Sequence, residues 1–146
     1  MDTFFLDTSA LFKRYRWEEG SATVEGLFAR QADRLIAEVT LLEVVSNLRR
    51  LLDVDRLITA EEFDVLLATF FDDLARELLQ VVRLSYAVIA TSLDIASRRY
   101  ITPLDAVQLA SALALPEPPV FVCADQKLLR LAEELGLETV DVSRDV

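Results

Sequence analysis

Four acidic residues stand where a predicted strand ends or a predicted helix begins. They are Asp7, Glu43, Asp105 and Asp125. In an open α/β sheet, the carboxyl ends of the strands and the N-termini of the following helices face one crevice, where ligands bind. Carboxylates gathered there repel one another, and a bound divalent cation relieves the repulsion. An all-oxygen ligand set suits Mg²⁺ or Mn²⁺ rather than zinc. The pattern therefore predicts a metal site for phosphodiester chemistry, in which the ion activates water.

Each of these acids also has a structural explanation. Asp7 and Asp125 are placed to N-cap the helices that follow them, and Glu43 and Asp105 each stand three residues after a threonine, as in a capping box. Taken singly, the structural explanation is the stronger one, but the shared placement of all four favours the metal site. Thr8 and Ser9 follow Asp7 and could hydrogen-bond a metal-bound water or orient Asp7, or could only cap the helix.

The amino-acid composition excludes several classes of enzyme and binding site. The chain has 146 residues, 53% of them hydrophobic, which predicts one domain over residues 1–146 with a core of its own. It contains no histidine and one cysteine, so Ser-His and Cys-His hydrolases, the usual zinc sites and an intrachain disulfide are excluded. Cys123 lies in a predicted strand and is expected to be a buried, small apolar residue. Catalysis must therefore rest on carboxylates, hydroxyls, lysine or a bound ion.

The formal net charge of −10 bears on the partners. Proteins that hold nucleic acid through a broad electrostatic footprint are usually basic, so an RNA substrate would be held locally, through metal ions and a few arginines. The candidates for phosphate contacts are Arg14, Arg16, Arg49 and Arg98, although for each arginine taken singly a solvated helix face is the stronger explanation. An acidic, apolar chain suits a basic partner protein. No secretory signal or membrane span is expected, and the predicted location is cytoplasmic.

Strands and helices alternate along the chain. Strands are predicted at 3–6, 34–37, 79–84, 120–123 and 138–142, and helices at 8–17, 21–31, 40–52, from 59 onward, 86–99, 102–115 and 126–135. Lys13, Arg14 and Arg16 are expected on the exposed face of the first helix. The alternation predicts an α/β three-layer sandwich with a five-stranded parallel sheet flanked by helices. The two helices at about 40–75 exceed what one crossover needs and could project as a partner-binding hairpin.

Four blocks in this order resemble the PIN-domain ribonucleases, specifically the VapC-like toxins of type II toxin–antitoxin pairs. The blocks are Phe5-Leu6-Asp7-Thr8-Ser9-Ala10-Leu11, Glu43-Val44-Val45-Ser46-Asn47-Leu48-Arg49-Arg50, Tyr100-Ile101-Thr102-Pro103-Leu104-Asp105-Ala106-Val107-Gln108-Leu109-Ala110 and Phe121-Val122-Cys123-Ala124-Asp125-Gln126-Lys127-Leu128-Leu129. The resemblance spans essentially the whole chain. One departure is Cys123, which stands where a threonine or serine is common in the family.

The resemblance implies a five-stranded parallel sheet, with Asp7, Glu43, Asp105 and Asp125 as catalytic metal ligands. It also implies Mg²⁺- or Mn²⁺-dependent cleavage of single-stranded or structured RNA, commonly tRNA or rRNA. A cognate antitoxin that masks the site and a homodimeric toxin are further implications.

Three alternatives compete with a toxin nuclease. One is a catalytically silent PIN-like scaffold that only binds a partner, against which the four retained acids speak. Another is a PIN nuclease with an RNA-processing role. The third, an aspartate-nucleophile phosphatase of the haloacid dehalogenase type, requires a second aspartate where this chain has Ser9.

Overall fold

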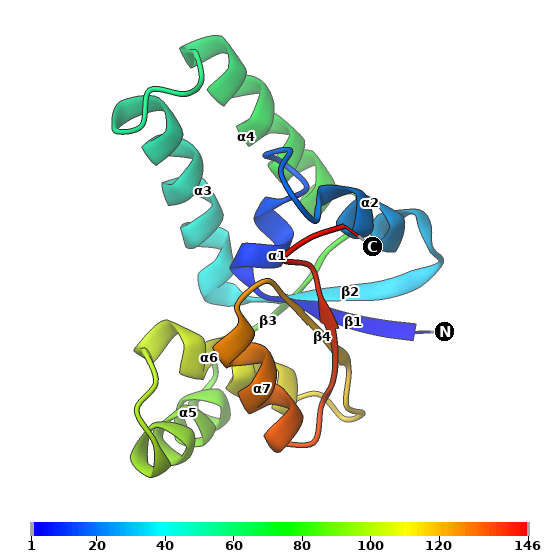
Figure 1. Ribbon diagram of the computed structural model, residues 1–146, viewed down its shortest axis with the longest axis vertical. Helices are drawn as coiled ribbons and strands as arrows, with labels where there is room; N and C mark the ends of the chain where they lie inside the picture. The colour runs from blue at the N-terminus through cyan, green and yellow to red at the C-terminus, as the bar shows by residue number, and fades with distance from the viewer. Residues whose placement is uncertain (1, 146) are drawn as a thin grey trace.

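A five-stranded parallel sheet forms the centre of the molecule. The computed structural model describes residues 2–145, and Figure 1 shows the strands crossing between two groups of helices. The strands are β1 (Asp2–Leu6), β2 (Ala32–Ala37), β3 (Gln80–Val82), β4 (Val120–Cys123) and β5 (Glu138–Asp141). All neighbouring pairs are parallel and the order is β3-β2-β1-β4-β5. The predicted fold class is therefore confirmed.

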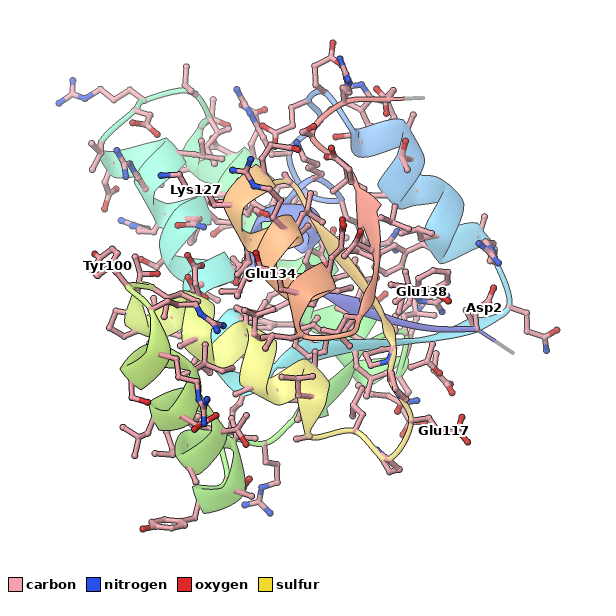
Figure 2. The ribbon with its side chains drawn as sticks, turned by 60° about the horizontal axis from the view of Figure 1, so that its bottom comes forward. Asp2, Tyr100, Glu117, Lys127, Glu134 and Glu138 are labelled. Carbon is pink, nitrogen blue, oxygen red and sulfur yellow. The ribbon has the colours of Figure 1, made fainter. Side chains whose placement is uncertain are left out.

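Seven helices cover the two faces of this sheet within the described residues, and Figure 2 shows helices on both sides of the strands from a second direction. They are α1 (Thr8–Phe12), α2 (Ser21–Ala29), α3 (Glu38–Asp53), α4 (Ala60–Ala75), α5 (Tyr86–Arg98), α6 (Pro103–Leu113) and α7 (Gln126–Glu134). Successive side chains of a strand point to opposite faces. Phe4 and Leu6 accordingly pack into a core formed with helices α1–α4. Phe5 packs into a second core formed with α5–α7, where its ring stacks on Phe121 with the ring centres 5.8 Å apart.

Register between β1 and β4 fixes the geometry of one sheet edge. Phe4 is opposite Val120 and Leu6 is opposite Val122, so the two strands reach their carboxyl ends together. The backbone N–H of Asp7 donates to the carbonyl oxygen of Val122 at 3.1 Å. The segments that leave these two strands, each beginning near an aspartate, therefore start side by side.

Helices α3 and α4 form a hairpin that extends away from the sheet (Figure 1). Apolar side chains on their facing sides, including Leu48 and Phe63, belong to the first core. A capping box begins α4, because Thr59 accepts from the backbone of Glu62 while the Glu62 carboxylate accepts from the backbone of Thr59. The hairpin occupies the region in which a projecting helical pair is predicted.

The first helix is shorter than predicted, ending at Phe12 instead of residue 17. Beyond it the N–H groups of Lys13, Arg14 and Tyr15 donate to carbonyls only three residues back, which tightens the chain into turns. These turns bury Lys13, whose ammonium donates to the Glu18 carboxylate at 3.0 Å. The expectation that Lys13 is exposed is therefore wrong.

Strand β3 is also shorter than predicted, at three residues instead of the span 79–84. It pairs only with β2 and lies at the edge of the sheet. None of the helices in the described part of the chain is long and apolar enough to cross a lipid bilayer.

Candidate active site

A cavity of about 230 Å³ opens at the edge where β1 and β4 end, and all four predicted acids line it. Its lining residues are Asp7, Thr8, Ser9, Glu43, Asn47, Leu104, Asp105, Gln108 and Asp125. They come from the β1–α1 corner, α3, α6 and the β4–α7 corner. The fold therefore brings together carboxylates that are remote in the sequence.

Asp7 is the most deeply buried of the four, with 5% of its surface exposed. It N-caps α1, and its Oδ1 accepts from the Ala10 backbone N–H at 2.9 Å and from the Ser9 hydroxyl at 2.7 Å. The Cys123 thiol donates to Oδ2 at 3.1 Å. Burial raises the pKa of Asp7 to about 6, because the ionised form loses its hydration, and the nearby Asp105 charge acts in the same direction.

Glu43 sits in a different place on its helix from the one predicted. Helix α3 begins at Glu38, directly after β2, so Glu43 lies in the second helical turn. The prediction of a capping box starting at Thr40 is wrong. The buried Thr40 hydroxyl instead lies 3.0 Å from the Thr8 hydroxyl and accepts from the Gln108 side chain at 2.9 Å.

A buried polar network holds the Glu43 carboxylate. Its Oε1 accepts from the Thr8 hydroxyl at 2.8 Å and from Gln108 Nε2 at 3.3 Å. Gln108 is a site residue that the sequence analysis missed. The signal was present, because Gln108 is the one residue with a large polar side chain among the apolar and small residues of 106–113, and it is 3% exposed.

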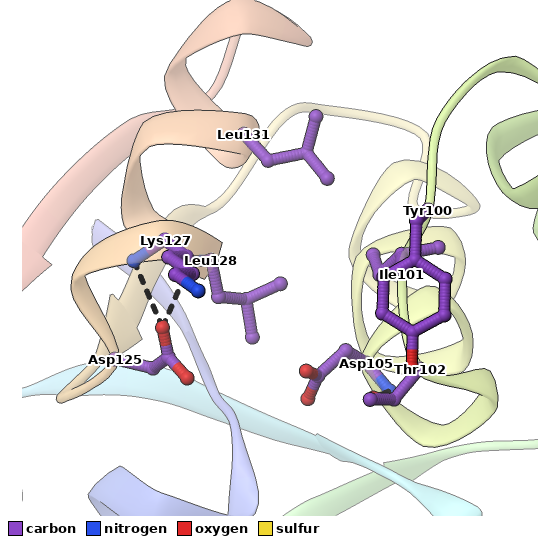
Figure 3. Close-up of a pocket in the computed structure, with 8 residues that line it drawn as sticks. All are labelled: Tyr100, Ile101, Thr102, Asp105, Asp125, Lys127, Leu128 and Leu131. Carbon is purple, nitrogen blue, oxygen red and sulfur yellow. Dashed lines mark hydrogen bonds between the residues drawn. The ribbon is translucent and has the colours of Figure 1, made fainter.

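Asp105 and Asp125 stand at the N-termini of α6 and α7. The Thr102 hydroxyl accepts from the Asp105 backbone N–H at 3.4 Å, as the predicted cap requires. Within residues 2–145 the Asp105 carboxylate itself accepts no hydrogen bond. Asp125 N-caps α7, since its Oδ1 accepts from the N–H groups of Lys127 and Leu128 at 2.8 and 3.1 Å (Figure 3). Both carboxylates therefore keep oxygens free for a ligand.

Thr8 and Ser9 contact the acids directly. The Ser9 hydroxyl donates to Asp7 and accepts from the Ala124 backbone N–H at 3.2 Å, so it links α1 to the β4–α7 corner. Thr8 donates to Glu43. The cap of α1 is Asp7, so neither hydroxyl serves only as a helix cap.

The four candidate arginines lie outside the acid cavity. Arg14 is half-buried, and its Nε donates to Asp73 at 2.8 Å, so its predicted exposure is wrong. Arg49 pairs with Asp53 and Arg98 with Asp94, each on its own helix. Among the described residues, Arg16 has no ion-pair partner within 4.0 Å. Contact between these arginines and RNA remains a prediction.

The donor set fits a hard divalent cation. Among residues 2–145, no group of three or more acidic or cysteine side chains is close enough together to hold a metal ion. Mg²⁺ normally keeps several waters and binds proteins through one or two carboxylates, so a spacious, oxygen-lined cavity suits it. A cation there would also favour the ionised form of Asp7 over the protonated form that burial favours.

Three solved structures share this fold along almost their full length. VapBC2 from Rickettsia felis, in its structure bound to a DNA fragment from the promoter, is 16% identical, with a TM-score of 0.68 and coverage of 95% of this chain and 99% of that chain. A toxin–antitoxin complex from Klebsiella pneumoniae is 14% identical (TM-score 0.67, 97% and 98% covered). FitAcB from Neisseria gonorrhoeae is 15% identical (TM-score 0.68, 96% and 98% covered).

Comparison at the level of sequence gives the family. No curated protein matches the chain closely enough to count as a relative. The sequence model of the PIN domain, however, matches residues 4–134, a span that contains all four acids and both aspartate corners. With its parallel sheet and acid-lined cavity, the chain belongs to the PIN domain family.

Proposed function

We propose that this protein is a metal-dependent endoribonuclease that acts as the toxin of a toxin–antitoxin pair. The observation that carries the proposal is the single cavity lined by Asp7, Glu43, Asp105 and Asp125. PIN domains are typically nucleases, and membership of that family supports phosphodiester hydrolysis at these carboxylates.

The four carboxylates would hold Mg²⁺ or Mn²⁺, one or two of them directly and the others through water molecules bound to the ion. When bound, the ion lowers the pKa of a water molecule, and its positive charge stabilises the phosphate oxygens. The chain's own residues do the positioning. Ser9 and Cys123 hold the two oxygens of Asp7, and Thr8 and Gln108 hold Glu43. Asp7 and Glu43 are thus oriented before any ligand arrives, which is the preorganisation that metal-ion catalysis requires.

RNA cleavage tests the nuclease directly. Wild-type protein, Asp7→Asn and the matched control Asp64→Asn, an exposed aspartate on α4, are incubated with tRNA, rRNA and single-stranded RNA in Mg²⁺ or Mn²⁺. We expect cleavage by the wild type and the control, and none by Asp7→Asn. Equal activity in all three would refute the proposal and favour a PIN-like scaffold that only binds a partner.

Thermal unfolding tests the metal separately from catalysis. A ligand that binds only the folded state, present at 100 times its Kd, stabilises that state by about 2.7 kcal/mol. The melting temperature of EDTA-treated protein should therefore rise with Mg²⁺ or Mn²⁺, and the rise should shrink in Asp7→Asn. If the melting temperature of neither protein changes with Mg²⁺ or Mn²⁺, the proposed metal site is refuted.

An antitoxin partner is proposed from charge and from the solved structures. Two of the similar structures are named as VapBC2 and as a toxin–antitoxin complex, and a net charge of −10 favours a basic partner. The projecting α3–α4 hairpin offers a surface for it. Expression of this protein alone should arrest growth, and co-expression with a small basic protein encoded beside it should relieve the arrest. Growth unaffected by the protein alone would favour an RNA-processing role.

We also propose that the toxin is a homodimer and that it is cytoplasmic. Sedimentation velocity would detect the dimer.

A further inference from the structure

A second cavity, of about 340 Å³, adjoins the acid cavity, and Asp105 and Asp125 line both. Its remaining lining residues are Tyr100, Ile101, Thr102, Lys127, Leu128 and Leu131. Figure 3 shows the two acids at one side of this space, with α7 on one flank and the α5–α6 connection on the other. A ligand with its phosphate at the acids would therefore continue into this second cavity, which we call the Tyr100 pocket.

The lining of the Tyr100 pocket suits a flat ring. Ile101, Leu128 and Leu131 supply apolar surface from its two flanks (Figure 3). Tyr100 stands at the rim with 94% of its surface exposed, so its aromatic face is free of packing against the protein. Exposed aromatic side chains beside a backbone-binding groove are the platforms on which single-stranded nucleic acids stack their bases. A volume of 340 Å³ is within the range of small-ligand pockets.

Lys127 adds an unpaired positive charge to the same pocket. Its side chain is exposed and has no carboxylate within 4.0 Å among residues 2–145. By contrast, Arg49 and Arg98 are each engaged by an aspartate one helical turn away. In a protein of net charge −10, a free cation next to the acid cavity is placed to contact a phosphate.

We propose that the Tyr100 pocket binds an unpaired RNA base next to the scissile phosphate, with the base stacked on Tyr100 and the adjoining phosphate contacted by Lys127. The inference rests on the proposed nuclease function and adds to it where the substrate strand lies. It also requires that the base be unstacked, so the substrate must be single-stranded at this nucleotide.

A protein segment is the competing occupant. The partner expected from the charge of this chain is basic, and Lys127 would repel a basic segment at the pocket. The continuity with the acid cavity likewise favours a ligand whose phosphate and ring lie side by side. These two features favour RNA.

The first test compares Tyr100→Ala with Tyr86→Ala, which removes another highly exposed tyrosine from the opposite end of α5. The probe is a mixed-sequence single-stranded RNA, intact or with one base removed at each position in turn. For the wild type, we expect KM to rise about tenfold when the base next to the cleavage site is removed, with kcat unchanged. Tyr100→Ala should show the same rise on intact RNA and no additional rise on the RNA lacking that base. Tyr100→Phe, which keeps an aromatic ring, should restore the dependence on that base, and Tyr86→Ala should behave as wild type.

The second test measures RNA binding by Lys127→Gln as a function of salt. Loss of one phosphate contact should reduce the slope of log K against log salt by about 0.7. An unchanged slope, or additive effects of Tyr100→Ala and base removal, would overturn the proposal. Unchanged RNA affinity with weaker binding of a basic partner protein would also overturn it and assign the pocket to that partner. If the wild type cleaves no RNA, the nuclease proposal fails, and the binding measurements still decide whether the pocket holds a base.

Discussion

Two corners of this molecule follow the same plan and differ in environment. At one corner β1 leads through Asp7 into α1, and at the other β4 leads through Asp125 into α7. The two strands are neighbours, and each aspartate accepts hydrogen bonds from backbone N–H groups of the helix that it caps. The hydrogen bonds of a helix cap are thus common to both.

Burial separates the two corners. Asp7 is enclosed by Ser9 and Cys123 and is 5% exposed, whereas Asp125 faces solvent. Water hydrates an exposed carboxylate, but enclosure removes that hydration and raises the pKa of Asp7 to about 6. A strand–aspartate–helix pattern in sequence therefore predicts a cap, and the surrounding side chains decide how strongly the charge depends on a cation.

The largest difference between substitutions at the two corners should be in catalytic activity. We expect Asp7→Asn to lower RNA cleavage by more than about 100-fold, since a fixed, enclosed ligand has no substitute. Asp125→Asn should lower it by about tenfold, because water can replace a solvent-facing oxygen. Initial rates at saturating Mg²⁺ measure both, and equal losses would show that burial does not rank the ligands.

The next largest difference should be in the free energy of unfolding without metal. The folded-state pKa of Asp7 lies above its ordinary value of 3.8, so the folded state binds this proton more tightly. Protonation of Asp7 therefore contributes to the free energy of unfolding. This contribution is greatest below about pH 4 and is lost as the pH rises to about 6. A rise of the Asp7 pKa from 3.8 to about 6 corresponds to about 3 kcal/mol. Asp7→Asn should therefore stabilise the EDTA-treated protein by up to about 3 kcal/mol at pH 7.5 and have little effect at pH 4.

Urea unfolding at the two pH values measures this difference. Asp125→Asn is the matched control, with an expected change within about 0.5 kcal/mol, because asparagine caps a helix as well as aspartate does. A gain at pH 7.5 that equals the gain at pH 4 would argue against an ionisation effect at Asp7.

Loss of the α7 helix cap alone should have a smaller effect on the free energy of unfolding. Asp125→Ala removes the acceptor for the Lys127 and Leu128 N–H groups and should cost about 1 kcal/mol of unfolding free energy. Unfolding of Asp125→Ala and Asp125→Asn in EDTA isolates the cap from the charge. If both variants are equally unstable, the cap is not the cause.

The smallest change concerns the thiol beside Asp7. In Cys123→Ser a hydroxyl, which is a stronger donor, would take over the bond to Asp7 Oδ2. We expect the pKa of Asp7 to fall by less than one unit, measured by NMR titration of the carboxyl carbon. A rise in that pKa would show that the serine hydroxyl does not donate to Asp7.

Sequence reasoning predicted the sheet, the order of the elements and the common placement of the acids, because alternating apolar runs and caps are local signals. It failed where tertiary contacts override local ones. Thr40 has the spacing of a capping residue, yet its hydroxyl is buried against Thr8 and Gln108, and α3 begins earlier.

Side chains that reach distant partners were equally beyond local reasoning. Lys13 and Arg14 were expected on a solvated face, but the turns after α1 bring Arg14 to Asp73 on α4. Nothing within ten residues of Arg14 indicates that partner. The network around Gln108 likewise joins α1, α3 and α6, and only the folded chain shows it.

The acid cavity draws its members from the beginning of the chain, at Asp7, and from its last long helix, at Asp125. During synthesis the N-terminal elements emerge first, while the segment carrying Asp125 is still inside the ribosome. An unfinished copy therefore lacks one wall of the cavity. Activity of the kind proposed would begin only after the segment that carries Asp125 has left the ribosome and folded against β1.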